Sequence, residues 1–401
     1  MTATVNLSYK PQAMKNTEAF LIEILTVEAE RLTPLQDLPV PYYGTIPWQE
    51  RVKGFLPPKE KSLFRRLHPS LQTLMMVLSR LQDAHPTLVD PGREWAILTA
   101  PQLEKERDEE HLKVLESPRK VSPSAGLALS ATGLNFLVAK TLGIRFYKGE
   151  TVAHVCASGN HLLNRAKELI QEGAQSVLVV TLNSMASMVR AAYHHRLGII
   201  SKRGVIRPFH KDRDGTIMAD GLAVALVVSA SLVESTGVPP LARIVEGGEV
   251  ADSYHMYGLD PEGEALQRAI EWALARGSLL PSEVRLVKCH GTGTQQNDAV
   301  EARVLKRLFH RSPPLVTALK PYFGHSVVSS ALVELAHLLK GIRDRGEVLP
   351  IPTTSPHQVD PQCLGLDLVL EKPRPFPGGY LLSLASGFGG FHSAVVLEVL
   401  P

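Results

Sequence analysis

The feature that most constrains the fold is a series of short, almost wholly apolar segments that alternate with amphipathic ones after residue 150. Residues 176–181 (SVLVVT) and 222–228 (LAVALVV) are typical of strands that are buried on both faces of a sheet. Residues 157–172 place their apolar side chains on one helical face, and Gly173 follows as a helix end. This alternation predicts a layered α/β fold.

Further segments of the same character extend the pattern. They predict helices at 264–276, 298–309 and 327–343, and strands at 151–155, 284–289, 315–319, 380–385 and 394–399. A break near residues 229–240 is compatible with two similar halves. The less regular first 120 residues predict a strand at 4–9, amphipathic helices at 18–32 and 63–81, and a strand at 95–98.

Composition excludes several classes of protein. The 401 residues are 44% hydrophobic, which is too much for a disordered chain. With 43 Lys and Arg against 40 Asp and Glu, the net charge is only +3, so no nucleic-acid partner is expected. Three cysteines without a CxxC pair favour a reducing compartment and argue against a cysteine metal site. The absence of a leader pattern and of an apolar run of about 18 residues predicts a cytoplasmic protein without a membrane span.

Four turns that follow predicted strands carry groups able to react. Cys156 lies at a strand-to-helix junction, where the helix dipole and backbone amides can stabilise a thiolate and hold an oxyanion. A buried core cysteine is the alternative. His290 begins HGTGT, and Lys320 and His325 lie in KPYFGH; the two histidines could face one pocket, or be ordinary loop histidines. Residues 386–390 (SGFGG) form either a flexible hairpin or a turn whose glycines let the backbone approach a substrate.

Taken together and in this order, the four turns resemble those of the β-ketoacyl-acyl carrier protein synthases, most closely the elongating synthase II type. The likeness extends from about residue 118 to the end. It includes PRKVSP (118–123), RPFHKDRDG (207–215), DSYHM (252–256), and Asp298 and Glu301 after HGTGT.

The resemblance implies a thiolase-like, five-layered αβαβα fold of two related halves. Residues 1–235, of which 1–115 diverge from the family, would form the half with Cys156, and residues 236–401 the half with His290 and His325. The implied function is that of a condensing enzyme in a specialised fatty-acid or polyketide pathway. An acyl group would pass from acyl carrier protein to Cys156 and then condense with malonyl carrier protein in a decarboxylative Claisen reaction. No permanently bound cofactor and no metal are expected, since phosphopantetheine carries the substrates.

The resemblance also implies roles for individual residues. Cys156 resembles the nucleophile, and His290 and His325 the pair that serves malonyl decarboxylation and stabilises the enolate. Lys320 and Glu334 match an ionic pair of the histidine network, which could equally be a buried pair that only orients a helix. The amides of Cys156 and Phe388 would form an oxyanion hole, with Gly387 and Gly389 in the same turn and Phe388 as a gate to the site.

The resemblance implies three further contact regions. Thr292 and Thr294 would contact pantetheine, and residues 185–195 would line an acyl tunnel. The carrier protein would be contacted by Arg65, Arg66, Arg119 and Lys120.

The chain departs from the family pattern at several positions. The valine-rich opening strand has only residues 4–9 as a candidate, and no Thr-Gly turn follows it. Ser386 replaces a phenylalanine, Phe391 and His392 replace a small Thr-Asn pair, and Cys289 replaces a small residue. We expect these changes to crowd the malonyl side of the site, which fits a specialised pathway enzyme.

Other functions stay open. One is an enzyme that transfers the acyl group from Cys156 without elongation. Another is a non-catalytic subunit that pairs with a related synthase, although such partners usually lack the cysteine. A metal hydrolase would need a ligand motif such as HExxH, which His290 and His325 do not belong to. The dimer expected from the resemblance could contain two copies of this chain or one copy with a related synthase subunit.

Overall fold

The computed structural model describes residues 17–29, 31–33, 43–57, 60–117, 119, 130, 132–185 and 187–400. One sheet of eleven strands, in the order β12-β10-β9-β14-β15-β8-β1-β7-β6-β4-β5, organises this part of the chain. Its strands are β1 (Ala19–Glu28), β4 (Glu94–Leu103), β5 (Arg145–Thr151), β6 (Ser176–Ser184), β7 (Gly221–Ser229), β8 (Ala242–Ala251), β9 (Val284–Lys288), β10 (Leu315–Thr317), β12 (Asp367–Leu368), β14 (Gly379–Gly387) and β15 (Phe391–Val399). Two short pairs lie apart from it: β2 (Arg31–Thr33) with β3 (Tyr43–Thr45), and β11 (Glu347–Val348) with β13 (Arg374–Pro375).

The same arrangement of strands occurs twice in this sheet. The order β1-β7-β6-β4-β5 on one side corresponds to β8-β15-β14-β9-β10 on the other. In both series the successive pairs are antiparallel, antiparallel, parallel and parallel. A short antiparallel contact between β1 and β8 joins the two series. The expectation of two related halves is therefore confirmed; the boundary at residue 235 stays a prediction and falls within α9 (Ala230–Thr236).

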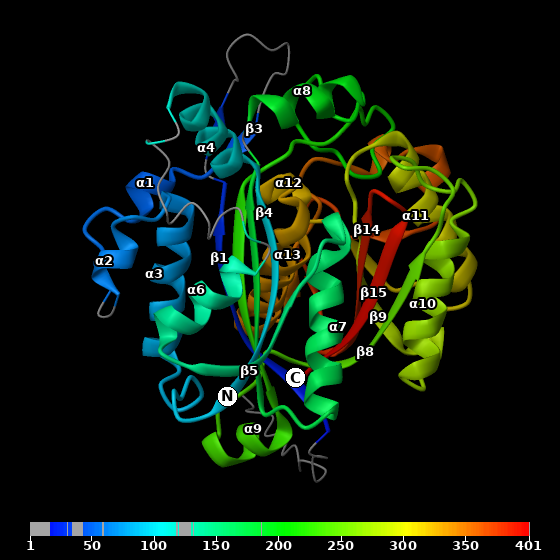
Figure 1. Cartoon of the computed structure of the whole chain (residues 1–401). Coiled ribbons are helices and arrows are strands. Elements are labelled where there is room, and N and C mark those ends of the chain that lie inside the picture. The colour runs from blue at the N-terminus through cyan, green and yellow to red at the C-terminus, as the bar shows by residue number, and fades with distance from the viewer. Residues whose placement is uncertain are drawn as a thin grey trace, which may run out of the picture.

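The helices complete five layers, as Figure 1 shows. Two helices, α7 (Ser158–Gln171) and α13 (Ser330–Arg345), lie between the two halves of the sheet and contact strands of both. The outer faces are covered by α3 (Pro69–Ala84) and α6 (Gly133–Leu142) on one side and by α10 (Glu264–Arg276) and α11 (Gln295–Leu308) on the other. The remaining helices are α1 (Trp48–Arg51), α2 (Lys61–Phe64), α4 (Glu104–Glu116), α8 (Met188–Arg196) and α12 (Lys320–Phe323), with the 3-10 turns η2 (Val155–Ala157), η3 (Pro281–Glu283), η4 (Val327–Ser329), η5 (Pro356–Gln358) and η6 (Pro361–Cys363).

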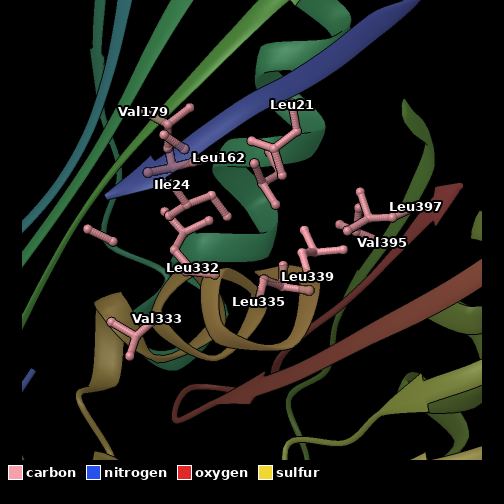
Figure 2. Close-up of a cluster of buried hydrophobic side chains, with 14 of the residues drawn as sticks. Leu21, Ile24, Leu162, Val179, Leu332, Val333, Leu335, Leu339, Val395 and Leu397 are labelled. Carbon is pink, nitrogen blue, oxygen red and sulfur yellow. The ribbon is translucent and has the colours of Figure 1, made fainter. Parts of the chain in front are cut away.

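Three hydrophobic cores fill the spaces between these layers. Along β6, Val177 and Val179 pack into the central core, while Leu178 and Val180 pack into an outer one. This alternation is the reason why the strand is apolar throughout, because both of its faces are buried. Figure 2 shows the central core, where Leu162 of α7 and Leu332 of α13 meet between the two sheet halves. The helices of this middle layer position the functional turns.

The predicted helix at residues 18–32 is wrong, because Ala19–Glu28 form β1. Apolar residues in this segment satisfy both helical and strand spacing, so the sequence pattern alone could not decide between them. Phe20 packs into an outer core and Leu21 into the central one, and β1 is paired on both sides, with β7 and β8. Tertiary pairing therefore determined the conformation. The predicted strand at 4–9 lies outside the described residues.

Most of the other predicted elements are present with shifted ends. The predicted strand at 151–155 is displaced, since β5 ends at Thr151 and η2 begins at Val155. The helix expected over 63–81 begins at Pro69, at the position where proline is well tolerated, and is preceded by the short α2. Strand β8 and helices α4, α6 and α8 were not predicted. None of the helices in the described ranges is long and apolar enough to span a membrane.

Candidate active site

Cys156 lies in the turn η2, directly before the central helix α7. The residue before it, Val155, has a φ of 47°, a left-handed conformation that β-branched residues rarely adopt. This turn directs the thiol toward the C-terminal half, where Cys156 Sγ lies 3.1 Å from His325 Nε2. The side chain is buried, with 7% exposed. A strained turn thus holds a thiol next to an imidazole.

The electrostatics of Cys156 differ from the sequence expectation. Burial raises the pKa of the thiol to about 12, and the nearby charge of Lys320 offsets this only in part. Burial therefore favours a neutral thiol in the resting site, in contrast to the thiolate that the sequence led us to expect. The sulfur must lose its proton as it reacts, and His325 Nε2 lies at hydrogen-bond distance to receive it.

His325 is fixed from both sides of its ring and by its backbone. Its Nδ1 lies 2.9 Å from the Ser330 hydroxyl at the start of α13, while Nε2 faces the thiol. The His325 N–H donates to the Ile217 carbonyl at 2.7 Å, and its carbonyl accepts from the Ala219 N–H at 3.0 Å. Burial lowers the pKa of this imidazole well below its usual value, and the charge of Lys320 adds to the effect. The histidine is therefore neutral near pH 7.

His290 follows β9 and lies across from His325, with ring centroids 5.3 Å apart. Its turn is anchored by Glu301 of α11, whose carboxylate accepts the His290 N–H at 2.6 Å and the Gly291 N–H at 2.8 Å. Asp298 accepts the Gly293 N–H at 3.2 Å. Burial also lowers the pKa of His290 well below its usual value, with Lys320 as the next contributor. Two neutral imidazoles therefore flank one thiol.

A buried ionic cluster lies beside the histidines. The Lys320 Nζ is 2.7 Å from Glu334 Oε1, and the side chains are 0% and 1% exposed. A second lysine, Lys288, places its Nζ 3.2 Å from Glu334 Oε2. The pairing of Lys320 with Glu334 agrees with the prediction, whereas Lys288 was not singled out in the sequence. The available signal was a lysine directly after the apolar residues Leu286 and Val287 of β9.

The glycine-rich turn packs directly on the nucleophile turn. A Cβ on Gly387 would lie 2.8 Å from the His154 carbonyl oxygen and 3.3 Å from the Cys156 nitrogen, so only glycine allows this approach. Gly389, with a φ of 84°, closes the turn, and its N–H donates to the Met256 carbonyl at 2.9 Å. This contact brings the chain that carries Phe388 next to Cys156, as an oxyanion hole requires.

A cavity of about 590 Å³ connects these groups. Its lining includes Cys156, His290, His325, Thr292, Thr294, Gly387 and Phe388. The hydroxyls of Thr292 and Thr294 lie 2.9 Å apart. Thus the cavity brings together most of the predicted site residues, whereas Lys320 and Glu334 lie behind its wall.

The predicted acyl-tunnel segment contributes only part of itself to this cavity. Arg190, Tyr193 and His194 line it, but His195 is exposed on α8. Two residues that sequence reasoning missed, Gln102 and Tyr257, line it as well. Gln102 comes from the end of β4 and Tyr257 from the loop after β8, which a single sequence does not bring together.

The predicted carrier-protein contacts lie elsewhere on the surface. Arg65, Arg66 and Arg119 are exposed and are not among the residues that line the cavity. Lys120 lies outside the described residues. Lys202, from another basic group of the sequence, does line the cavity.

The expectation that four replacements crowd the malonyl side is wrong for three of them. The Phe391 ring stacks on His154 at 4.5 Å and lines a separate cavity of about 230 Å³. His392 lies 3.0 Å from the Ser386 hydroxyl and 3.1 Å from Asp252, and it too borders this second cavity. Cys289 is fully buried in an outer core. Only Ser386 of the four lines the main cavity; His392, its partner across the β14–β15 pair, contacts the Ser386 hydroxyl without reaching that cavity.

The arrangement also bears on metal binding. The Cys156 sulfur and the ring nitrogens of His290 and His325 lie within 4.8 Å of one another. Sulfur and nitrogen ligands of a tetrahedral zinc would be about 3.5 Å apart, whereas Cys156 Sγ and His325 Nε2 are 3.1 Å apart. The geometry fits a thiol–imidazole hydrogen bond better than a pair of metal ligands.

Comparisons with known proteins agree with this site. Residues 102–232 match the family model "Beta-ketoacyl synthase, N-terminal domain", and residues 241–351 match "Beta-ketoacyl synthase, C-terminal domain". The chain is 32% identical over 252 residues to 3-oxoacyl-[acyl-carrier-protein] synthase 2 of Mycobacterium bovis, a match that covers 61% of this chain and 60% of the relative. It is 30% identical over 287 residues to putative polyketide beta-ketoacyl synthase 1 of Streptomyces cyaneus, covering 70% and 67%.

Among solved structures, the ishigamide ketosynthase/chain length factor matches with a TM-score of 0.81 at 19% identity, covering 96% of this chain and 99% of that one. This likeness establishes the thiolase-like fold. Cys156 lies in the segment that matches the N-terminal family model, and His290 and His325 lie in the segment that matches the C-terminal one. The chain therefore belongs to the beta-ketoacyl synthase family.

Proposed function

We propose that this protein is a condensing acyltransferase. It takes an acyl group from acyl carrier protein onto Cys156 and joins it to malonyl carrier protein with loss of carbon dioxide, giving β-ketoacyl carrier protein. The observation that carries the proposal is the buried Cys156 thiol, 3.1 Å from His325 Nε2, in a cavity that His290 also lines. This combination supplies a nucleophile, its base and a second imidazole.

In the first half-reaction the Cys156 sulfur attacks the thioester carbonyl carbon. The bond to the phosphopantetheine sulfur breaks, and the proton from Cys156 passes through His325 Nε2 to that sulfur. The amides of Cys156 and Phe388 stabilise the oxyanion that forms on the carbonyl oxygen. Because the resting thiol is neutral, deprotonation is coupled to the arrival of the substrate.

In the second half-reaction malonyl carrier protein loses carbon dioxide, and the electron pair forms an enolate. Neutral His290 and His325 can each donate an N–H to the enolate oxygen. The enolate carbon attacks the acyl carbonyl, the bond to the Cys156 sulfur breaks, and a proton from solvent restores the thiol. The Ser330 hydroxyl beside His325 Nδ1 can donate or accept a hydrogen bond. It therefore supports both tautomers that the two half-reactions require of His325.

The carrier protein is the proposed partner and its phosphopantetheine the proposed carrier of both substrates. Thr292 and Thr294 line the cavity, where their hydroxyls would bind the amide groups of pantetheine. Exposed Arg65, Arg66 and Arg119, with Lys202 at the cavity, offer positive charge to an acidic carrier protein. Charge of this kind would mainly raise the association rate.

A second synthase subunit is the other proposed partner. Within the part of the chain that the structure describes, strand β5 is the last strand of the sheet and pairs on one side only, with β4. Its Phe146 and Tyr147 side chains are 41% and 52% exposed. An exposed edge with aromatic side chains favours pairing with another strand. The partner is either a second copy of this chain or a related synthase subunit.

Intact-protein mass spectrometry tests the catalytic proposal. The chain is incubated with acyl carrier protein that carries a panel of acyl thioesters, alone and together with a related synthase subunit. We expect an acyl adduct on the wild type and none on Cys156→Ala. Addition of malonyl carrier protein should then remove the adduct and release a β-ketoacyl product.

Two outcomes would contradict the proposal. An adduct that malonyl carrier protein does not discharge would indicate acyl transfer without elongation. No adduct from any donor would indicate a non-catalytic subunit. Three further predictions stay untested within this proposal. They are that no cofactor is permanently bound, that the protein is cytoplasmic, and that the boundary between the two halves lies at residue 235.

A further inference from the structure

Glu334 is shared by two buried lysines that approach it from different elements. Lys320, the first residue of α12, contacts Oε1 at 2.7 Å, and Lys288, the last residue of β9, contacts Oε2 at 3.2 Å. Lys288 also donates to the Leu384 carbonyl of β14 at 3.3 Å. All three charged side chains are at most 1% exposed. One carboxylate therefore faces two ammonium groups in a site without solvent.

This cluster carries a surplus positive charge when both lysines are protonated. Burial lowers the pKa of Lys288, and the carboxylates of Glu334 and then Glu301 oppose this by favouring the charged ammonium. The oxygens of Glu301 already accept hydrogen bonds from the amides of His290 and Gly291. Burial raises the pKa of Glu301 to about 7, so Glu301 supplies only a partial negative charge near neutrality. A buried surplus charge lowers the stability of the folded state. If Lys288 served only to pack the core, an apolar side chain could take its place with little loss of stability.

The surplus charge lies close to the reacting groups. Lys288 is two residues before His290, so on an extended strand their side chains point to the same side. Lys320 is five residues before His325 in the next turn. Both lysines contribute to the lowered pKa of both histidines, after the larger effect of burial. The other titratable groups acting on this pair are His392 and His194, together with the Cys156 thiol.

We propose that Lys288 is a positioning residue of this site. With Lys320 it holds both oxygens of Glu334, and its positive charge adds to that of Lys320 in favouring neutral His290 and His325, which act as hydrogen-bond donors and bases during turnover. The kinetic part of this inference rests on the proposed condensation, but the charge state of the histidines does not.

The sign of the effect follows from electrostatics. A nearby cation disfavours protonation of an imidazole, so removing the cation raises the pKa of both histidines. A protonated His325 cannot accept the Cys156 proton. The acidic limit of activity should therefore move to higher pH when the cation is removed. Loss of one nearby unit charge in a protein interior typically shifts the pKa of an imidazole by about one unit.

Lys288→Gln tests this because it removes the charge and keeps hydrogen-bond donors. Lys167→Gln is the matched control: Lys167 is also buried and paired with one glutamate, Glu246, but it is not among the charged groups that act on His290 or His325. NMR of ring-labelled histidine follows the imidazoles without substrate, and the pH profile of condensation follows them in turnover. In Lys288→Gln we expect the histidine pKa values and the acidic limit of the pH profile to rise by about one unit. In Lys167→Gln both quantities should keep their wild-type values, and in Lys288→Arg they should return to those values.

A uniform fall in rate at every pH, with unshifted histidines, would overturn the proposal and leave Lys288 a structural role. If Lys288→Gln does not fold, NMR of the lysine side-chain nitrogens in the wild type decides, since a neutral Lys288 amine at pH 7 contradicts the inference. If no donor gives condensation, the proposed function fails while the histidine titration still tests Lys288.

Discussion

The two halves of the molecule share a scaffold but contribute unequally to the chemistry. Each has the strand order described above, and each has a 3-10 turn that leads into a central helix, η2 before α7 and η4 before α13. Both turns even begin with a valine in a left-handed conformation, Val155 with φ 47° and Val327 with φ 42°. Yet the N-terminal turn holds the thiol, whereas the C-terminal half holds both site histidines and the ionic cluster. The repeated fold brings two equivalent turns together, and side-chain identity then makes them different.

The buried charges of the two central helices give the largest expected difference in stability. Glu334→Gln would leave Lys288 and Lys320 without a carboxylate, and we expect a loss of about 3–5 kcal/mol in the free energy of unfolding. The matched change Glu246→Gln should cost less, since Glu246 is 10% exposed at its side chain and water can reach the Lys167 pair. Chemical denaturation of both variants measures this. Equal losses of unfolding free energy in Glu334→Gln and Glu246→Gln would contradict this expected difference between the two buried ionic groups.

The contact between the two halves at the nucleophile turn should be nearly as sensitive. A methyl group on Gly387 would press on the His154 carbonyl and the Cys156 nitrogen, so Gly387→Ala should displace the oxyanion-binding amides. We expect acyl transfer to Cys156 to slow by about 100-fold, measured by the rate of adduct formation. Gly341→Ala is the control, since its methyl group would meet the flexible end of Arg345 at 3.1 Å; it should react as the wild type does. Acylation of Gly387→Ala at the wild-type rate would show that this turn does not position the oxyanion-binding amides.

His194 gives the N-terminal half a pH dependence of its own. Burial lowers the pKa of His194 to about 4, so between pH 6.5 and 4 the unfolded chain binds a proton that the folded chain does not. Stability from this residue is therefore complete above pH 6.5 and falls as the pH is lowered toward 4, by up to about 3 kcal/mol. Comparing unfolding of the wild type and His194→Gln across this range isolates the effect. Parallel curves for the two proteins would contradict the burial of a neutral imidazole here.

The two left-handed valines provide the smallest and most symmetrical comparison. Glycine relieves a left-handed conformation by about 1–2 kcal/mol but gives up the buried side chain. Val155 is only half-buried, so Val155→Gly should stay within about 1 kcal/mol of the wild type. Val327 is 1% exposed, so Val327→Gly should lose about 1–2 kcal/mol net. Thermal unfolding of both variants checks the order, and a larger loss for Val155→Gly would reverse the comparison.

The sequence predicted the site better than the fold of the first hundred residues. Cys156, His290, His325 and the Lys320–Glu334 pair come together as expected because each lies next to a predictable strand or helix end. The opening strand β1 was mistaken for a helix, since its apolar spacing suits both and its partners lie about 200 residues away. The expectation for Phe391 and His392 was wrong because both border a second cavity, through contacts with His154 and Asp252 that lie far away in the sequence.

By itself, the sequence determined the alternation of strands and helices after residue 150 and the order of the four reactive turns. These depend on local hydrophobic spacing and on short motifs, which one chain displays directly. The tertiary structure alone decided three other properties: that the Cys156 thiol is neutral, that Lys288 shares Glu334, and that Gly387 packs against the nucleophile turn. Each of these depends on burial or on contact between residues far apart in the chain, and local spacing carries no information about either.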